Sequence, residues 1–194
     1  MLLIDGIKLK GRPAEIPDCA RDDLPQFFVD MGFKAGVEIG VDKGDFAEKF
    51  AKKGLTLHAI DPWQYDNDYK DRHSQATLDS IYEKTKMLLS PYPNCKIIRK
   101  TSIGAVNDFE DESLDFVYID GNHQLKYVIE DIFEWSKKVK VGGIIPGHDY
   151  IYTNPKTIAG VCHVIFAVNA YTQAYKIRNW FLLGEYKNKP GEKR

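Results

Sequence analysis

Short apolar runs alternate with longer amphipathic segments along most of the chain, and glycines or polar clusters separate them. Apolar runs of about 4–8 residues between turn-forming residues are typical of buried strands, whereas apolar positions three or four residues apart are typical of helices. The alternation predicts an α/β fold in which helices cover both faces of a parallel sheet. Strands are predicted at 36–39, 56–60, 96–99, 114–119 and 142–145, and helices at 24–31, 45–53, 75–89, 124–139 and 157–170.

The two ends of the chain depart from this alternation. Residues 1–30 contain prolines and are predicted to form an arm that leads onto the sheet. Residues 176–178 and 180–186 are predicted to be two final strands that form a hairpin, and the polar residues 187–194 are expected to fray. Because the chain shows neither repeats nor a linker, its 194 residues predict a single domain, 1–194.

The candidate chemistry follows the predicted strands. In parallel α/β sheets, ligands bind beyond the carboxyl ends of the strands, near the point where the strand order reverses. The segments to consider are therefore 38–45, 61–63, 100–102, 120–123 and 146–150.

The first of these segments, GVEIGVDKGDF, has the strand–turn–helix pattern of a phosphate-binding loop but unsuitable charges. A dinucleotide site uses G-x-G-x-x-G, whereas this loop combines Gly40 and Gly44 with Asp42 and Asp45. Carboxylates beside a pyrophosphate would cost on the order of several kcal/mol through like-charge repulsion. S-adenosylmethionine carries a sulfonium, an ammonium and a carboxylate, so it suits the loop. We expect Glu38 to hold the ammonium group and the backbone N–H groups of the loop to meet the carboxylate.

The next predicted strand ends in Asp61, about twenty residues further on, where a carboxylate can accept both ribose hydroxyls of an adenosine ligand. Trp63 follows in the aromatic and acidic segment 61–73 and is the best candidate ring for contact with the cofactor. This segment alternatively forms a lid over the acceptor, or a surface loop that its aromatic residues anchor. The structural alternative for Glu38 and Asp61 is that they cap helices or are solvated.

Composition narrows the classes of function. The chain is 43% hydrophobic and 28% charged, which is ordinary for a globular protein. A net charge of −1 and a pI of about 6.5 argue against nucleic acid or an acidic membrane as partner. Three dispersed cysteines without C-x-x-C spacing favour structural thiols in a reducing compartment. No segment approaches the roughly 20 apolar residues of a membrane span, so a cytoplasmic protein is expected.

Two polar clusters follow neighbouring predicted strands. YIDGNH places Asp120 and His123 after one strand, and GHDY places His148 and Asp149 after the next. Neighbouring strand ends would bring these four side chains within reach of one site. Carboxylate oxygens suit Mg²⁺, and imidazoles shift the preference toward Mn²⁺, Fe²⁺ or Zn²⁺. The structural alternative for Asp120 is the N-cap of the following helix, a position for which Asn122 competes.

These segments together resemble the class I S-adenosylmethionine-dependent methyltransferases. The resemblance covers roughly residues 36–150 and is strongest in IDGNH and GHDY. Its closest branch is the small-molecule O-methyltransferases that include the macrolide sugar methyltransferases. It implies a Rossmann-like sheet of seven mostly parallel strands with the last strand antiparallel, and a small-molecule or sugar hydroxyl as acceptor. The segments that carry it are VEIGVDKG, AIDPW and SLDFVYIDGNHQLKYVIEDIFEWSKKVKVGGIIPGHDY.

The resemblance also implies roles for the two clusters. Asp120 and Asp149 would be ligands of a divalent metal such as Mg²⁺ or Mn²⁺, His148 would take the remaining ligand position, and His123 would be the general base. His148 stands where the sugar methyltransferases have a carboxylate, so a metal-free site is the alternative. Ser102 falls where this superfamily contacts the adenine. The predicted cofactor-binding residues are Glu38, Gly40, Asp42, Gly44, Asp61, Trp63, Ser102 and Asp120.

Two other functions stay open at this point. One is an NAD(P)-dependent oxidoreductase, against which the acidic loop and the missing G-x-G-x-x-G and Tyr-x-x-x-Lys patterns argue. The other is a non-catalytic protein that binds S-adenosylmethionine. The expected partner is a small-molecule acceptor, and the sequence leaves both its identity and a homo-oligomeric state open.

Overall fold

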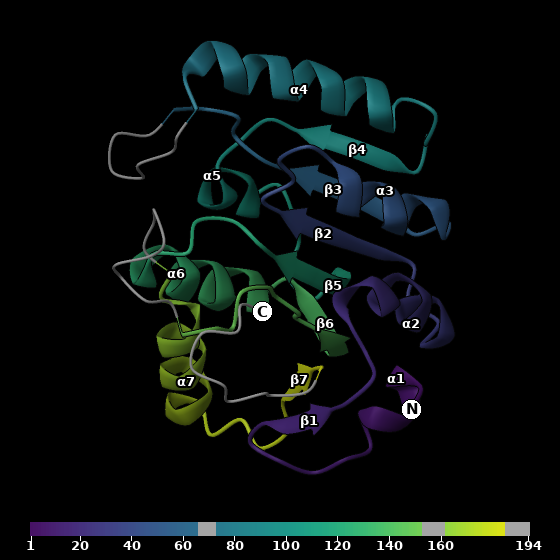
Figure 1. Cartoon of the computed structure of the whole chain (residues 1–194), viewed down its shortest axis with the longest axis vertical. Helices are drawn as coiled ribbons and strands as arrows, with labels where there is room; N and C mark the ends of the chain where they lie inside the picture. Colours follow the sequence, from purple (N-terminus) through teal and green to yellow (C-terminus); the bar gives the residue numbers. More distant parts are fainter. Residues whose placement is uncertain (66–72, 153–161, 185–194) are drawn as a thin grey trace.

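The computed structural model describes residues 1–65, 73–152 and 162–184. Five strands, all parallel to their neighbours, form the main sheet in the order β4-β3-β2-β5-β6 (Figure 1). This arrangement confirms the predicted Rossmann-like α/β fold, and two of the strands have their predicted bounds. The strands are β2 (Ala35–Ile39), β3 (Thr56–Ile60), β4 (Cys95–Ile98), β5 (Leu114–Ile119) and β6 (Val139–Ile144).

Helices cover both faces of this sheet. On one face, α2, α3 and α4 pack through an aromatic core in which Phe28 stacks on Phe116, with ring centroids 4.3 Å apart. On the other face, α5 and α6 pack around the fully buried Trp135. The helical segments are α1 (Leu3–Gly6), the 3-10 turn η1 (Arg21–Asp23), α2 (Leu24–Asp30), α3 (Asp45–Lys52), α4 (Gln75–Leu89), α5 (Ser102–Val106), α6 (Leu125–Ser136) and α7 (Val164–Ala174).

The strand order reverses at β2, which lies between β3 and β5. The chain builds outward from β2 to β4 and then returns to place β5 on the other side of β2. Ile39 pairs with Ile119 at the end of this junction, and the Asp120 N–H donates to the Ile39 carbonyl at 2.8 Å. The carboxyl ends of β2 and β5 therefore meet at the switch point, where ligands bind in folds of this kind.

The prediction of seven strands in one sheet, with the last strand antiparallel, is wrong for the described residues. β7 (Phe181–Leu183) pairs in parallel with β1 (Ala14–Ile16) in a separate two-stranded sheet, rather than adding an antiparallel seventh strand (Figure 1). The N-terminal arm supplies an apolar edge for this pairing, because Ile16 is fully buried. Residues 176–178 do not form the predicted strand, since Lys176 takes a positive φ of 55° just after α7.

Two other boundaries differ from the prediction. α6 ends at Ser136, and β6 begins at Val139 rather than 142, because Val139 already pairs with Leu114 of β5 although the first half of β6 is largely exposed. α7 begins at Val164; part of the predicted helix 157–170 and the tail 187–194 lie outside the described residues. Within the described residues, no helix has the length and apolarity that crossing a bilayer requires.

Candidate functional site at the carboxyl ends of β2, β5 and β6

The loop after β2 approaches the end of β5 closely. Gly40 and Gly44 take positive φ values of 85° and 84°, and Asp42 takes 46°. A Cβ at Gly40 would overlap the main-chain carbonyl of Asp120, so a side chain is sterically excluded there. Gly44 forms the N-cap of α3 in the left-handed conformation, which glycine adopts without strain. The two glycines therefore let the loop turn tightly from β2 into α3 while it passes close to the end of β5.

Asp61 supports this loop from the end of β3. Its carboxylate accepts hydrogen bonds from the backbone N–H groups of Asp42 at 3.0 Å and Trp63 at 2.7 Å. Burial raises the pKa of Asp61, and these two hydrogen bonds oppose the shift. Each carboxylate oxygen already accepts one bond, which leaves one lone pair on each for the predicted ribose hydroxyls. Binding of ribose by Asp61 stays a prediction.

Trp63 lies beneath the loop. Its ring is only 1% exposed, and its indole N–H donates to the Asp42 carbonyl at 2.9 Å. The Thr85 hydroxyl donates to the same carbonyl at 2.8 Å. Trp63 therefore packs beneath the loop and stabilises it. Its burial gives no evidence for the predicted contact with the cofactor, which stays a prediction.

Glu38 is an acidic side chain of β2 that is buried in the core. It is 2% exposed, and its Oε2 has no hydrogen-bond partner among the described residues. Burial, followed by the nearby Asp120, raises the pKa of Glu38 well above its ordinary value. Glu38 is therefore neither a helix cap nor a solvated acid. A buried acceptor without a partner is costly unless a ligand satisfies it.

Ser102 occupies a buried network on the opposite face of the sheet. Its hydroxyl donates to the Asp131 carboxylate and accepts from the Trp135 indole N–H at 2.8 Å. Burial raises the pKa of Asp131 to about 6. The predicted adenine contact of Ser102 stays a prediction. Sequence reasoning missed Asp131, although an acid between Val128 and Trp135 on the apolar stripe of α6 was a visible signal.

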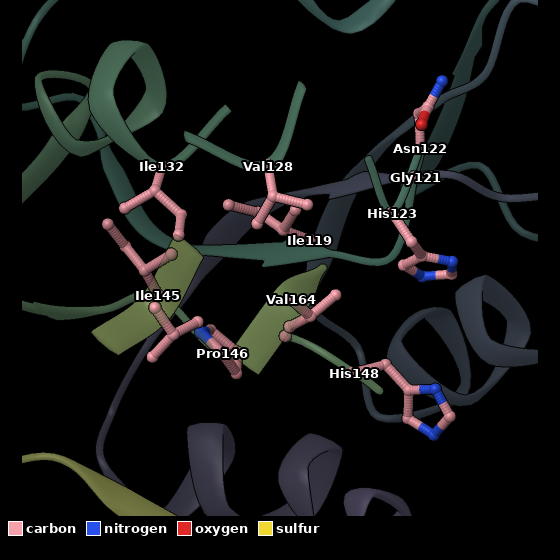
Figure 2. Close-up of a pocket in the computed structure, with 12 residues that line it drawn as sticks. Ile119, Gly121, Asn122, His123, Val128, Ile132, Ile145, Pro146, His148 and Val164 are labelled. Carbon is pink, nitrogen blue, oxygen red and sulfur yellow. The ribbon is translucent and has the colours of Figure 1, made fainter. Parts of the chain in front are cut away.

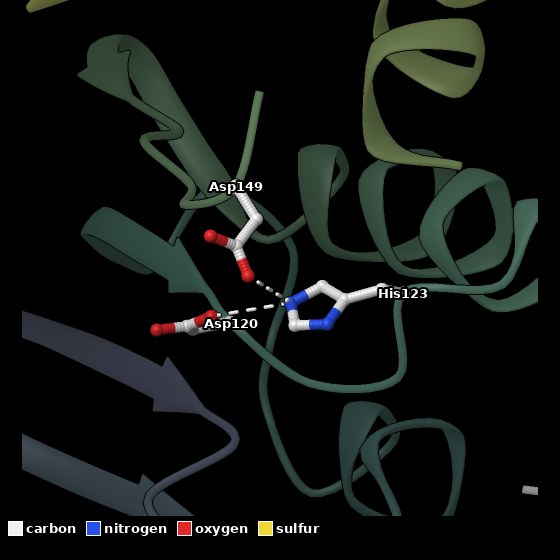
Figure 3. Close-up of side chains that lie close together, drawn as sticks. All are labelled: Asp120, His123 and Asp149. Atoms are coloured by element: carbon white, nitrogen blue, oxygen red, sulfur yellow. Dashed lines mark hydrogen bonds and ion pairs between the residues drawn. The ribbon is translucent and has the colours of Figure 1, made fainter. Parts of the chain in front are cut away.

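The two predicted clusters meet at the carboxyl ends of β5 and β6. The His123 ring lies between two carboxylates, with Nε2 3.3 Å from Asp120 Oδ1 and 3.6 Å from Asp149 Oδ2 (Figure 3). One potential ligand atom from each residue lies within 4.8 Å of the others. All three side chains are partly exposed, so a ligand can reach them.

His148 lies at the rim of this group. Its Nδ1 is 3.1 Å from Asp149 Oδ1 and 3.8 Å from Asp120 Oδ1. The hydrogen bond with Asp149 raises the pKa of His148 and lowers that of Asp149. The described geometry groups His123, the predicted base, with the two acids, and it leaves His148, the predicted ligand, at 37% side-chain exposure. The roles of the two histidines stay predictions.

The loop that carries His123 is fixed from both sides. The Asn122 side chain accepts from the Gln124 N–H at 2.9 Å, so Asn122 rather than Asp120 forms the turn before α6. The His163 Nδ1 accepts a hydrogen bond from the Leu125 N–H at 3.2 Å. The backbone N–H of His163 donates to the His123 carbonyl at 2.7 Å. His163 therefore connects the start of α7 to the candidate site.

A small cavity of about 70 Å³ adjoins the histidines. It lies between the ends of β5 and β6 and helices α6 and α7, and Figure 2 shows the imidazoles of His123 and His148 at one end of it. The rest of its wall is mainly apolar. Its apolar lining includes Ile119, Val128, Ile132, Ile145, Pro146 and Val164.

Comparisons with known proteins agree with this arrangement. A family model described as a methyltransferase domain matches residues 37–150. The matched range contains the loop after β2, Asp61 and both polar clusters. Among curated proteins, an uncharacterized protein of Sinorhizobium fredii is 29% identical over 92 residues, which is 47% of this chain. The chain matches only 10% of that relative's length.

Solved structures share the fold at low sequence identity. A Staphylococcus aureus protein assigned as a caffeoyl-CoA O-methyltransferase is 16% identical, with a TM-score of 0.58 over 84% of this chain and 75% of that one. An O-methyltransferase from Bacillus cereus, in complex with S-adenosylhomocysteine, is 13% identical, with a TM-score of 0.56 over 79% and 66% of the two chains. At these identities the similarity shows the fold.

Proposed function

The chain belongs to the S-adenosylmethionine-dependent methyltransferase family, and from this premise we propose that it methylates a hydroxyl group of a small molecule or sugar. The observation that carries the proposal is the His123 imidazole between Asp120 and Asp149, beside the loop after β2. Methyl transfer to oxygen is an in-line displacement at the sulfonium methyl, and the acceptor hydroxyl must be at least partly deprotonated. An imidazole is the side chain best suited to take that proton near neutral pH.

The cofactor is proposed to lie across the switch point. Glu38 supplies a buried carboxylate without a partner for the ammonium group, and the tight turn at Gly40 lets the ligand approach the backbone. Asp61 has lone pairs left for the ribose hydroxyls. These charges disfavour a pyrophosphate, so they also argue against NAD(P) as the cofactor.

His123 is the proposed proton acceptor of the site without metal. Once protonated, its imidazolium is stabilised by the carboxylates of Asp120 and Asp149 on either side. Much of the remaining rate enhancement would come from holding the hydroxyl oxygen in line with the methyl group. The protein contributes to this orientation through the hydrogen bonds that His163 makes to the His123 loop.

A divalent metal ion fits the same residues. Two carboxylates and an imidazole suit Mn²⁺ or a similar ion, and Asp120, His123 and Asp149 would hold it. A bound ion would lower the pKa of the acceptor hydroxyl and orient it. With His123 engaged as a ligand, His148 at the rim would be the group left to take the proton.

The cavity beside His123 is proposed to receive an apolar part of the acceptor. Its volume of about 70 Å³ is below the roughly 150 Å³ of a cavity that binds benzene. A short alkyl branch next to the reacting hydroxyl fits this space better than an aromatic ring.

Calorimetry tests the cofactor first. We expect S-adenosylhomocysteine to bind and NAD to give no measurable heat. Transfer of a labelled methyl group from S-adenosylmethionine to a panel of hydroxylated small molecules, with and without EDTA, then tests the reaction and the metal. Binding of NAD without binding of S-adenosylhomocysteine would overturn the proposal.

A further inference from the structure

Arg21 brings a guanidinium group from the N-terminal arm to the acidic end of β2 and β5. Its Nη1 lies 3.5 Å from Asp120 Oδ2, and its Cζ lies 5.2 Å from the centroid of the Phe46 ring in the first turn of α3. Arg21 and Asp120 are 99 residues apart in sequence. Arg21 therefore reaches the switch point although no sequence motif connects it to the site.

The backbone around Arg21 is held in place. Asp22 forms an ion pair with Lys49 of α3 at 2.7 Å, and the Asp23 carboxylate accepts from the Ala20 N–H at 2.8 Å. The ion pair joins η1 to α3 and the hydrogen bond stabilises the turn itself, while the side chain of Arg21 is 43% exposed. The guanidinium can thus change partners without movement of the main chain.

Two buried polar groups lie beside Arg21, and one of them lacks a partner among the described residues. Glu38 and Tyr118 pair across β2 and β5, and the Glu38 Oε2 is buried without a hydrogen bond, whereas the Tyr118 hydroxyl interacts with the Arg21 guanidinium. Burial and Asp120 raise the pKa of Tyr118, and the nearby Arg21 opposes this shift. Glu38 and Arg21 each interact electrostatically with Asp120 and with one another, so a buried unpaired acid and a partly exposed cation face the same end of β2 and β5.

We propose that Arg21 binds the carboxylate at the amino-acid end of the cofactor while Glu38 binds its ammonium group. The inference rests on the proposed function, and it adds a residue that neither the family match nor the sequence motifs assign. An α-amino acid carries both charges on one carbon, which matches a cation and an anion that lie close together. The planar guanidinium can also bind a carboxylate through two parallel hydrogen bonds.

The present partner of Arg21 does not compete strongly with such a ligand. At 3.5 Å and with both side chains partly exposed, the ion pair with Asp120 contributes little to stability. Transfer of Arg21 to the cofactor carboxylate also frees Asp120 for His123 and the acceptor. Binding of the cofactor would therefore complete the acceptor side of the site.

Lys52 provides a charge control. It lies in the last turn of the same helix α3, and its Nζ pairs with Glu48 Oε2 at 2.8 Å rather than with η1. A general loss of positive charge around α3 would affect Arg21→Ala and Lys52→Ala alike. A specific contact with the ligand would affect Arg21→Ala alone.

The test compares S-adenosylhomocysteine with 5′-methylthioadenosine, which lacks the amino-acid end, by calorimetry. We expect Arg21→Ala to weaken binding of S-adenosylhomocysteine about 10- to 100-fold, the usual loss of a charge-assisted contact. Arg21→Lys should lose less affinity for S-adenosylhomocysteine, because lysine keeps the positive charge but cannot form two parallel hydrogen bonds with a carboxylate. Binding of 5′-methylthioadenosine should be the same in all variants, and Lys52→Ala should bind both ligands like the wild type.

An equal loss for both ligands in Arg21→Ala, or no loss for S-adenosylhomocysteine, overturns the inference and leaves the proposed function standing. A wild-type protein that binds neither ligand overturns both. Thermal unfolding of Arg21→Ala separates a contact effect from misfolding, since a partly exposed side chain should leave the midpoint nearly unchanged. Because the 5′-methylthioadenosine measurement uses the same samples, it also reports whether the adenosine part of the site is intact.

Discussion

The Asp61 carboxylate accepts a hydrogen bond from the Asp42 N–H at 3.0 Å, so the end of β3 holds the loop that follows β2. The same carboxylate fixes the turn at Trp63. Asp61 therefore has a structural role whether or not it also binds ribose, and the two roles can be separated by substitution.

We predict that Asp61→Ala weakens binding of S-adenosylhomocysteine and lowers the free energy of unfolding, each by about 1–3 kcal/mol. Two backbone N–H groups lose their acceptor, and the cofactor loses a partner. Asp61→Asn keeps one acceptor oxygen for the backbone N–H groups. It should therefore lose less of the free energy of unfolding than of the affinity for S-adenosylhomocysteine. Calorimetry and denaturant unfolding measure the two effects, and unchanged affinity in both variants would sink the ribose assignment.

Glu38→Gln should stabilise the protein and impair the binding of cofactor. Because burial raises the pKa of Glu38, the folded protein binds a proton that the unfolded chain releases from about pH 4.3 upward. Wild-type stability from this group is present below that pH and is lost as the pH rises through the folded pKa. The neutral glutamine avoids this loss, so the variant should gain about 1–3 kcal/mol near pH 7 and little at pH 4.

Thermal unfolding across this pH range tests the prediction for Glu38. Glu83→Gln, a change at an exposed acid on α4, is the control. Its stability relative to the wild type should not increase as the pH rises from 4 to 7. A Glu38→Gln protein that is less stable than the wild type at pH 7 would mean that the carboxylate is satisfied in the folded state.

Local patterns sufficed to predict much of the sheet and its helices. α4 has its predicted bounds because Ser74 caps its first turn and a regular amphipathic pattern follows. The pairing of β1 with β7 was not predictable in this way. It joins Ala14 to Phe181 through two three-residue strands, and such short segments carry no periodicity.

The grouping of residues in the candidate site was also predictable from the sequence, but the orientation of its side chains was not. The rule that ligands lie beyond strand ends placed Asp120, His123 and Asp149 together, because neighbouring parallel strands end at one edge. The rule does not give the direction of each imidazole, so the positions of His123 and His148 relative to the acids had to come from the structure. The approach of Arg21 depends on packing of the arm against α3, which no spacing in the sequence encodes.

Asp149→Ala should abolish any metal-dependent activity while sparing the affinity for S-adenosylhomocysteine. Asp149 follows β6, and its carboxylate contacts His123 and His148 rather than the loop after β2. Asp111→Ala, which removes an exposed acid paired with Lys138, serves as a control. Turnover with and without EDTA, and calorimetry with Mn²⁺, are the measurements. If EDTA leaves wild-type turnover unchanged, the metal proposal fails and the methyltransferase proposal survives.

The last prediction concerns the identity of the general base. If His123 takes the proton of the acceptor, His123→Ala should lower the rate of methyl transfer by roughly 10²–10⁴ and leave S-adenosylhomocysteine affinity nearly intact. His123→Gln, which forms hydrogen bonds but carries no proton at neutral pH, should be almost as slow. His148→Ala should keep most of the rate, because His148 lies at the rim and is the more exposed ring. Single-turnover transfer, measured with EDTA so that no metal contributes, compares the three variants.

A reversed order, with His148→Ala slow and His123→Ala fast, would move the base to His148. The pH dependence of the rate then provides a second criterion. The hydrogen bond between His148 and Asp149 raises the pKa of His148. A rate that depends on His148 as the base should therefore rise with pH through a midpoint above 6.5. Asp149→Asn removes the charge that raises this pKa and should shift the midpoint down. Because Asp149 contacts both rings, the deciding comparison is with His148→Ala. A rate that rises through the same midpoint in the wild type and His148→Ala would exclude His148 as the base.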